Sequence, residues 1–315
     1  MKALAAVLEK FSEPLVLKEV DVGDGIPVRV KASGMCGRDL VIWRGGFRNL
    51  TPPLILGHEI FGEHEGKPVG VYGMETCGTC KYCREGKENL CENARFFGEA
   101  RPGGYAELIT VNKGSLFPLP DREYEKYAAA VCPLATAIHS AKLVGVKKGD
   151  TILVTGAGGG VGIHTIQYLK SLGARVVSQT SPSKRELVSN YSDQVVTERN
   201  FSREVKEVDA VIELVGGETI NESLRTLKRE GTLVLVGNVS GKEISLSRPA
   251  LTIMREQRII GSASYTRKEI EEAIKLIHQG VITPVYRRYS LREVNNAISD
   301  LSEGRVTGRA ILVPN

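Results

Sequence analysis

Apolar runs separated by helical stretches dominate the chain from about residue 133 to residue 265. Short strands are predicted at 151–155, 175–179, 193–197, 209–215, 232–237 and 258–262, and a helix at 161–173 follows the first of them. Continuous apolar strands that alternate with helices are typical of a parallel sheet covered on both faces. This part of the sequence therefore predicts a doubly wound α/β domain.

The N-terminal part has a different pattern, which predicts a β-rich domain. VRVKASG (28–34) and ELITVN (107–112) alternate or are β-branched, and glycines and prolines separate such runs. The first residues predict a strand and not a signal peptide, because charges interrupt the apolar run and no small-residue cleavage site follows. The tail predicts two helices and a last strand, RAILVP (309–314). We therefore expect one domain from residues 1–132 and 266–315 and a second from 133–265.

Composition narrows the class of protein. The chain has 315 residues and a net charge of +5, with cations mixed among acids, so we expect no nucleic-acid partner. No apolar run reaches the ~18 residues that a membrane span needs, so we expect no membrane partner. A cytoplasmic protein that acts on a small molecule is the expectation.

A glycine-rich turn, TGAGGGVG, lies between the strand at 151–155 and the helix that follows it. Glycines there allow a tight turn and let backbone N–H groups at a helix N-terminus approach a pyrophosphate. The turn predicts a dinucleotide site. Its predicted contacts are Gly156, Gly158, Gly159, Gly160 and Val161, with Gly237 and Asn238 at the end of a later strand.

The residues after the second strand of this unit indicate which dinucleotide binds. An NAD site usually ends that strand with an acid, whereas here the next acid is Glu186. Hydroxyls and cations stand there instead, at Thr180, Ser181, Lys184 and Arg185. They suit a 2′-phosphate, so NADPH is favoured over NADH. The alternative is that Lys184 and Arg185 are only surface residues.

Four cysteines in the spacing C-x2-C-x2-C-x7-C predict a metal lobe at 77–91. Cys77, Cys80, Cys83 and Cys91 can enclose a zinc ion tetrahedrally and leave no open position, so a structural role is expected. An iron–sulfur cluster is the alternative. In ferredoxin-type runs, however, the fourth cysteine follows after three residues and precedes proline, whereas Cys91 precedes Glu92.

A second metal site is suggested by Cys36, the pair His58-Glu59 and Cys132. Ligands from three separated segments would make a three-ligand zinc site with an open fourth position. Each residue alone is weak support, because a lone buried cysteine is usually part of the core.

Taken together, these features resemble the zinc-containing medium-chain dehydrogenase/reductase family, to which alcohol dehydrogenases belong. The resemblance covers nearly the whole chain. It rests on C-x-x-D at 36–39, GHE at 57–59, GGYAE at 103–107, the cysteine lobe, Cys132 and the GAGGGVG turn. It implies a GroES-like catalytic domain, a Rossmann NADP(H)-binding domain with the active site in the cleft between them, and a homodimer or homotetramer.

The resemblance also implies roles for individual residues. It implies catalytic zinc on Cys36, His58 and Cys132, with Glu59 as a neighbouring or exchanging ligand. Asp39 would hydrogen-bond the imidazole of His58 and fix its tautomer. The family mechanism passes a hydride between the nicotinamide and a carbonyl or alcohol carbon, with zinc as Lewis acid.

Arg38 departs from the family pattern. Dehydrogenases of the family carry a serine or threonine there, whose hydroxyl passes the alcohol proton towards solvent. A guanidinium has no acceptor and stays protonated, so it cannot replace that relay. The C-x-R-D variant is similar to acryloyl-CoA reductase-like members.

Three interpretations follow from these residues. The leading one is a zinc-dependent NADP(H) alcohol dehydrogenase or carbonyl reductase. The second is an NADPH-dependent reductase of activated C=C bonds in an enoyl thioester or quinone, in which Arg38 binds an anion or polarises a thioester carbonyl. The third is a non-catalytic NADPH-binding protein.

Overall fold

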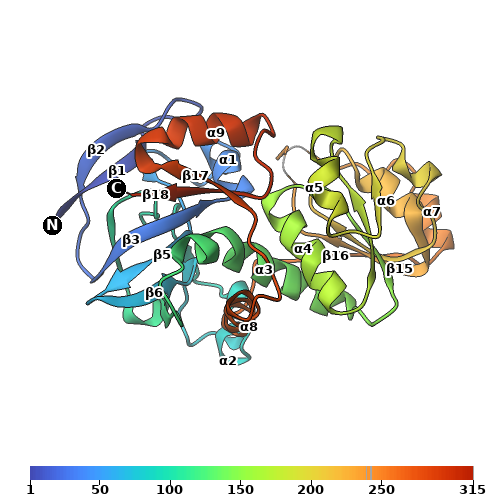
Figure 1. Cartoon of the computed structure of the whole chain (residues 1–315), viewed down its shortest axis with the longest axis horizontal. Helices are drawn as coiled ribbons and strands as arrows, with labels where there is room; N and C mark the ends of the chain where they lie inside the picture. The colour runs from blue at the N-terminus through green and yellow to red at the C-terminus, as the bar shows by residue number, and fades with distance from the viewer. Residues whose placement is uncertain (239, 242, 315) are drawn as a thin grey trace. The chain divides into compact units, whose positions relative to one another are not determined.

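The structure, a computed structural model, describes every residue except 239, 242 and 315 (Figure 1). The chain divides into two compact units, residues 1–132 with 266–279 and 284–315, and residues 133–265 with 280–283. The sequence placed 280–283 with the first unit, and this is wrong. The Gln167 side chain explains the grouping, because it accepts a 2.8 Å hydrogen bond from the Thr283 N–H and donates a 3.0 Å bond to the Thr283 carbonyl.

The first unit is built mainly from antiparallel strands, as the sequence predicted. One sheet has the order β10-β6-β5-β3-β18-β17, with β9 also on β3, and a smaller sheet has the order β2-β1-β4. The last strand, β18, pairs antiparallel with β3, so the tail does return to this unit. The strands are β1 (Lys2–Leu8), β2 (Val16–Asp21), β3 (Ile26–Met35), β4 (Leu54–Ile55), β5 (Glu59–His64), β6 (Lys67–Val71), β7 (Met74–Glu75), β8 (Arg95–Phe96), β9 (Leu108–Val111), β10 (Leu116–Pro118), β17 (Tyr286–Ser290) and β18 (Arg309–Val313).

Short helices connect these strands. They are α1 (Gly37–Trp43), α2 (Lys81–Arg84), α8 (Arg267–His278) and α9 (Val294–Ser302). Helix α1 begins where β3 ends, and Cys36 caps it: the Asp39 side chain accepts a 2.7 Å hydrogen bond from the Cys36 N–H. The C-x-x-D spacing is therefore also a capping box, which closes the first turn of the helix.

Helix α3 (Tyr124–Val144) carries Cys132 and continues into the second unit. It is long and apolar enough to span a membrane, but 78% of its most apolar window is buried. A helix that is apolar all round and covered by protein is a core helix.

The second unit contains a six-stranded parallel sheet, drawn from green to orange in Figure 1. Its order, β13-β12-β11-β14-β15-β16, is that of a doubly wound dinucleotide-binding fold. The strands are β11 (Thr151–Val154), β12 (Arg175–Gln179), β13 (Gln194–Val196), β14 (Val208–Glu213), β15 (Leu227–Leu235) and β16 (Arg258–Gly261). The helices are α4 (Gly160–Ser171), α5 (Arg185–Ser189), α6 (Ile220–Thr226) and α7 (Pro249–Met254).

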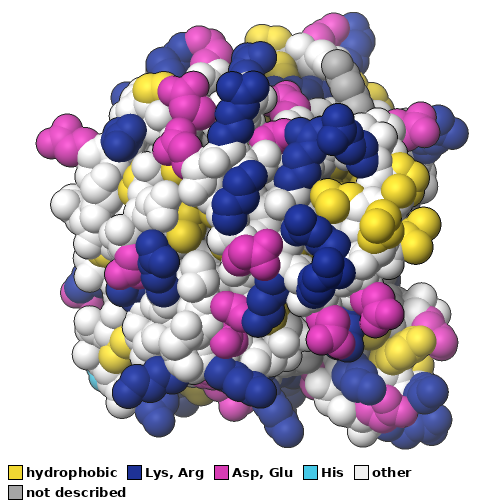
Figure 2. Space-filling view, turned by 90° about the vertical axis from the view of Figure 1, so that its right-hand side faces the viewer, with side chains coloured by type: hydrophobic (Ala, Val, Ile, Leu, Met, Phe, Trp, Pro, Cys, Tyr) yellow, Lys and Arg dark blue, Asp and Glu magenta, His cyan; other side chains and the backbone are white. Residues whose placement is uncertain are grey.

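Apolar side chains of this sheet form its core, and charges of both signs cover it. Leu153, Val177 and Val211 belong to one buried cluster. On the face drawn in Figure 2, lysine and arginine side chains are interspersed with aspartate and glutamate. Within the second unit, Lys170 Nζ lies 2.7 Å from Asp193 Oδ1. In such ion pairs, each positive side chain is neutralised by a neighbouring carboxylate.

Candidate functional site

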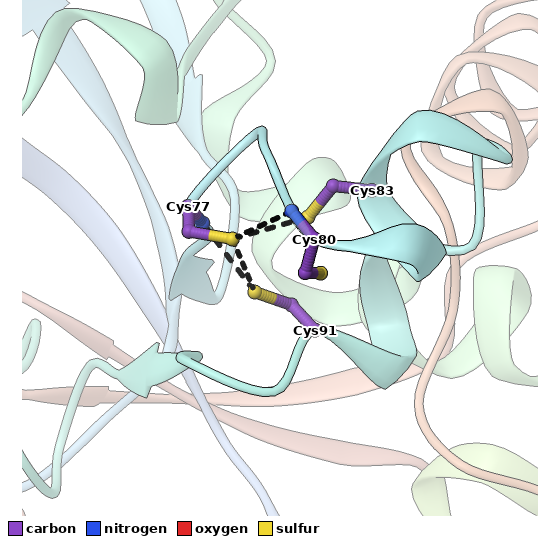
Figure 3. A group of neighbouring side chains, drawn as sticks. All are labelled: Cys77, Cys80, Cys83 and Cys91. Atoms are coloured by element: carbon purple, nitrogen blue, oxygen red, sulfur yellow. Dashed lines mark hydrogen bonds between the residues drawn. The ribbon is translucent and has the colours of Figure 1, made fainter.

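The four cysteines of the lobe turn their sulfurs towards one another (Figure 3). Their four Sγ atoms all lie within 4.8 Å of one another, and Cys77 Sγ is 3.6 Å from Cys91 Sγ and 4.0 Å from Cys83 Sγ. A tetrahedral zinc ion with Zn–S bonds of about 2.3 Å has sulfur–sulfur edges of about 3.8 Å. The cysteines are free thiols, and their arrangement fits zinc.

Backbone N–H groups prepare this lobe for a cation. The N–H groups of Thr79 and Cys80 lower the pKa of the Cys77 thiol to about 5, and the Cys80 N–H lies 3.3 Å from Cys77 Sγ. A thiol that loses its proton readily is the form that binds metal.

A second group of metal-binding side chains lies between β3, β5 and α3. The ligand atoms of Cys36, His58 and Glu59 lie within 4.8 Å of one another. Cys132 is not part of this compact group, but its Sγ lies 4.0 Å from His58 Nε2. The resemblance implied Cys132 as a ligand and Glu59 as a neighbour. The structure brings all four side chains together: Cys132 also hydrogen-bonds Cys36 and Glu59.

The donor set of this second group fits a zinc ion as well. It offers thiols, an imidazole nitrogen and a carboxylate, which are the ligands zinc takes in proteins. Glu59 Oε2 and Asp39 Oδ1 are buried and accept no hydrogen bond from any residue that the structure describes. Buried carboxylate oxygens without a donor are costly, and a cation beside Glu59 would offset that cost.

The two ring nitrogens of His58 face different groups. Nε2 faces Glu59 Oε1, at 3.8 Å, and Cys132 Sγ, whereas Nδ1 lies 3.6 Å from Asp39 Oδ1. The hydrogen bond implied between Asp39 and this imidazole is therefore not formed at this distance. The other oxygen of Asp39, Oδ2, accepts hydrogen bonds from the Cys36 N–H at 2.7 Å and the Tyr105 hydroxyl at 2.9 Å, which leaves Oδ1 facing the imidazole.

The charges around the second group favour a thiolate at Cys36. A hydrogen bond from Cys132, together with Arg309 and His58, lowers the pKa of Cys36 well below its ordinary value, although burial opposes this. Burial raises the pKa of Glu59 to about 7, and Arg309 opposes that rise.

Arg309 is a site residue that the sequence did not reveal. It is 4% exposed, and its Nη2 donates a 2.7 Å hydrogen bond to Glu59 Oε1. Gly34 makes room for the same carboxylate, because a Cβ on Gly34 would lie 1.9 Å from Glu59 Oε2. The available signal was a buried-strand pattern, RAILV, that starts with an arginine.

Arg38 is held in an aromatic cage. Its Cζ lies 4.9 Å from the ring centroid of Phe47 and 4.7 Å from that of Phe96. Its Nε donates a 2.5 Å hydrogen bond to Glu99 Oε1. Burial lowers the pKa of this guanidinium, but Glu99, Cys36 and Asp39 together raise it above its ordinary value, so the group stays charged. The sequence predicted the charge and not the cage.

The cage leaves one edge of Arg38 available to a ligand. Among the residues that the structure describes, its two Nη atoms make no hydrogen bond, and the side chain is 36% exposed. A planar cation that contacts two aromatic rings and is held at Nε, with a free donor edge, is prepared to bind an anionic oxygen.

The glycine turn has the geometry of a phosphate-binding loop. Gly156 has φ +63°, and a Cβ on Gly162 would lie 2.4 Å from the Gly156 carbonyl oxygen. Only glycine fits at these positions. Gly159 caps α4, and Gly160 and Val161 are its first residues, so their N–H groups lie at a helix N-terminus.

The predicted phosphate-selecting residues lie beside this turn. A Cβ on Gly158 would lie 2.8 Å from Thr180 Oγ1 and 2.7 Å from Lys184 Cδ, so both side chains contact the loop. Burial lowers the pKa of Lys184. Ser181 and Arg185 are exposed on the same segment.

The loop after β14 also meets the turn, and the end of β15 meets that loop. Val215, after β14, would contact a Cβ on Gly156 at 3.0 Å, and Asn238, after β15, would contact one on Gly216 at 2.9 Å. A Cβ on Gly237 would lie 2.4 Å from the Leu214 carbonyl oxygen. The predicted cofactor residues thus follow the carboxyl ends of three parallel strands, β11, β12 and β15, which is where open α/β sheets bind ligands.

Glu213 links the end of β11 to the loop after β14, and it was not identified from the sequence. Its buried carboxylate accepts hydrogen bonds from Thr155 Oγ1, Thr219 Oγ1, Ser223 Oγ and the N–H groups of Val215 and Gly216. Such a saturated carboxylate fixes the loop after β14 against the glycine turn.

The fold and the site define a zinc-containing, nicotinamide-dependent oxidoreductase. Two family models match the chain, the alcohol dehydrogenase GroES-like domain over residues 23–121 and the zinc-binding dehydrogenase domain over residues 160–279. The chain belongs to the zinc-containing medium-chain dehydrogenase/reductase family.

Relatives of several activities are similar to the chain. An acryloyl-coenzyme A reductase from Metallosphaera sedula is 35% identical over 90% of this chain and 91% of its own length. A D-arabinose 1-dehydrogenase (NADP(+)) from Saccharolobus solfataricus is 31% identical over 100% of this chain and 98% of its own. Among solved structures, the alcohol dehydrogenase of Aeropyrum pernix matches with a TM-score of 0.92 and 29% identity, over 99% of this chain and 100% of its own.

Proposed function

We propose that the protein is an NADP(H)-dependent, zinc-containing reductase of a carbon–carbon double bond conjugated to a thioester carbonyl. The single observation that carries this proposal is the caged Arg38, with its free Nη edge two residues from Cys36. The similarity to acryloyl-coenzyme A reductases, at 35% and 33% identity, supports the same substrate class.

The chemistry of the substrate explains why a fixed cation is useful. Reduction adds a hydride to the β carbon and a proton to the α carbon, and negative charge develops meanwhile on the thioester oxygen. The Nη donors of Arg38 would hold that oxygen, and the preformed cage spares the side chain any rearrangement. Conversely, Arg38 cannot accept the proton that an alcohol must lose on oxidation.

The proposal assigns the cofactors to residues described above. Cys77, Cys80, Cys83 and Cys91 would hold a structural zinc ion, and Cys36, His58, Cys132 and Glu59 a second one. Thr180, Ser181, Lys184 and Arg185 would bind the 2′-phosphate of NADP(H), beside the glycine turn. When bound, the nicotinamide supplies the hydride and the second zinc ion supplies a Lewis acid.

NADP(H) is proposed over NAD(H) because Lys184 and Thr180 contact Gly158 and no acid lies between them. NAD-dependent alcohol dehydrogenases are also among the relatives, so similarity alone does not select the cofactor. The proposal rests on the side chains beside the turn.

Reduction of a ketone or aldehyde is the second candidate, and the metal group favours it. The thiols of Cys36 and Cys132 and the imidazole of His58 would supply three zinc ligands, and Glu59 would be a fourth that can give way to substrate. A Lewis acid in that position suits the polarisation of a carbonyl oxygen.

A purified-enzyme assay separates these candidates. NADPH oxidation is followed with acryloyl-CoA, a quinone and acetophenone, before and after a chelator removes metal. The proposal predicts the highest kcat/KM with acryloyl-CoA. Turnover of the ketone alone, abolished by the chelator, would establish the second candidate instead. No NADPH oxidation with any of these substrates, together with tight NADPH binding, would indicate a non-catalytic NADPH-binding protein.

A further inference from the structure

Tyr105 joins the two segments that carry the second metal group. Its side chain is fully buried, and its hydroxyl donates a 2.9 Å hydrogen bond to Asp39 Oδ2. Its ring packs on Gly57, where a Cβ would lie 2.5 Å from Tyr105 Cδ1. Gly57 has φ +95° and precedes His58. One side chain therefore contacts both the C-x-x-D segment and the GHE segment.

The two carboxylate oxygens of Asp39 accept different numbers of hydrogen bonds. Oδ2 accepts from both the Tyr105 hydroxyl and the Cys36 N–H, whereas Oδ1 is buried without a partner among the described residues. Because two donors hold Oδ2, the carboxylate cannot rotate without losing one of them. Oδ1 therefore stays turned towards His58 Nδ1, 3.6 Å away.

This geometry matters for the other ring nitrogen of His58. Nε2 faces Glu59 Oε1 and Cys132 Sγ, so it is the nitrogen available to a metal ion. A carboxylate that receives the Nδ1–H fixes the tautomer in which Nε2 is unprotonated, and makes that nitrogen a stronger ligand. The 3.6 Å gap is short enough for a small shift of the imidazole to close it.

We propose that Tyr105 is a positioning residue of the second metal centre, whose hydroxyl holds Asp39 in the orientation that receives the Nδ1–H of His58. The inference rests on the metal site proposed above and not on the choice of substrate. It differs from a packing role, because packing on Gly57 needs only the ring, whereas orientation of Asp39 needs the hydroxyl.

Tyr105→Phe separates these two roles, since it removes one oxygen and keeps the ring. Tyr289→Phe is a matched control: Tyr289 is 5% exposed and its hydroxyl donates a 2.7 Å hydrogen bond to Asp300 Oδ2, in the same unit. Both variants lose one tyrosine–aspartate hydrogen bond. Only Tyr105→Phe touches the metal group.

The measurement is the affinity for zinc or cobalt, by competition with a chelator in the full-length protein. The number of ions bound per chain is counted. A Cys132→Ser variant, which lacks one ligand of the second site, shows which of the bound ions the four-cysteine lobe holds. Outer carboxylate partners of ligating histidines are worth ~10–100-fold in metal affinity. We expect Tyr105→Phe to weaken the second ion about tenfold or more, on that scale, with the lobe ion and the control unchanged.

An Asp39→Asn background gives the second test. If the hydroxyl acts through Asp39, Tyr105→Phe should cause little further loss there. Equal metal affinity of Tyr105→Phe and wild type, or an undiminished loss in the Asp39→Asn background, overturns the inference alone. A wild-type chain that binds only the lobe ion overturns the metal site and the inference with it. A urea unfolding curve of Tyr105→Phe that matches the wild-type curve shows that the variant is folded.

Discussion

Arg309 donates a 2.7 Å hydrogen bond to Glu59, although 250 positions separate the two residues in sequence. Both side chains are almost completely buried, at 4% and 0% exposure. The pair connects β18, at the end of the chain, to β5, which begins the metal segment. A buried charge pair of this kind is strongly disfavoured once either partner is removed, because the other charge then stays buried and uncompensated.

Arg309→Met should therefore lower the free energy of unfolding by about 3–5 kcal/mol. Urea denaturation of the metal-free protein measures this. The double variant Arg309→Met with Glu59→Gln should recover part of the loss, since glutamine carries no charge. A single variant as stable as the wild type would show that the pair contributes nothing.

Gly34 provides the space that the Glu59 carboxylate occupies. A methyl group at Gly34 would lie 1.9 Å from Glu59 Oε2 and 2.4 Å from the Ala128 carbonyl oxygen. Gly34→Ala should destabilise the protein by about 1–3 kcal/mol or more, as overpacking does, and should weaken binding of the second metal ion. Gly37→Ala is the control, because nothing lies within 4 Å of its added Cβ. Equal melting temperatures for the two variants would contradict the prediction.

The sheet of the second unit was predictable from sequence, and the side-chain contacts of the first unit were not. Strands such as β11 and β12 are apolar on both faces, and this local property is visible in a few consecutive residues. The glycine turn is equally local, since its spacing expresses the sterics of a single loop. The sequence also indicated that the C-terminal tail returns to the first unit, because its last strand could not extend the parallel sheet of the second unit.

The contacts of Arg309, Tyr105 and Arg38 join residues that are far apart in the sequence. Tyr105 and Asp39 are 66 positions apart, and Arg38 and Glu99 are 61 apart. In neither pair does the spacing of one residue point to the other. Tyr105 is placed by its backbone N–H bond to the Leu56 carbonyl, and Glu99 lies in the loop after β8. Glu59, by contrast, begins β5 directly after His58, so the sequence itself brings it to the metal group.

Arg38→Ser tests the proposed role of the caged guanidinium. Loss of an oxyanion donor costs ~100–1000-fold in rate, so we expect acryloyl-CoA reduction to fall by that order. Alcohol oxidation should rise, because serine restores a hydroxyl relay at this position. Arg44→Ser, at the exposed end of α1, is the matched control and should leave both rates unchanged. A variant that reduces acryloyl-CoA as fast as the wild type would remove the main support for the thioester proposal.

Lys184→Ala tests the cofactor assignment. A hydrogen bond to a charged group contributes about 1.5–3 kcal/mol, so the KM for NADPH should rise by ~10–100-fold. The KM for NADH, which lacks the 2′-phosphate, should change less than about twofold, because no charged contact is lost. Steady-state kinetics with both cofactors measure the ratio, and the exposed Lys147→Ala serves as control. Equal losses for NADPH and NADH would refute the 2′-phosphate contact.

Asp193 makes the stability of the second unit sensitive to acid. Its Oδ2 accepts a 2.7 Å hydrogen bond from the Val176 N–H, and its Oδ1 a 2.7 Å bond from Lys170 Nζ. Burial raises the pKa of this carboxyl, but Lys170, the Val176 N–H and Arg175 together bring it below the ordinary value of 3.8. The folded state therefore holds this proton less tightly than the unfolded state does. The resulting stability is present above about pH 4, near the unfolded pKa, and is lost as the pH falls through the lower folded value.

Asp193→Asn should therefore reduce the fall in the urea midpoint below about pH 4. It should also lower the midpoint at neutral pH, because the carboxylate charge that pairs with Lys170 is lost. Glu198→Gln, an exposed substitution in the same unit, should leave the profile as in the wild type. Midpoints are compared at several values from pH 6 down to pH 3, with tryptophan-independent detection such as far-ultraviolet circular dichroism. Parallel profiles for Asp193→Asn and wild type would mean that this carboxylate does not carry the acid sensitivity.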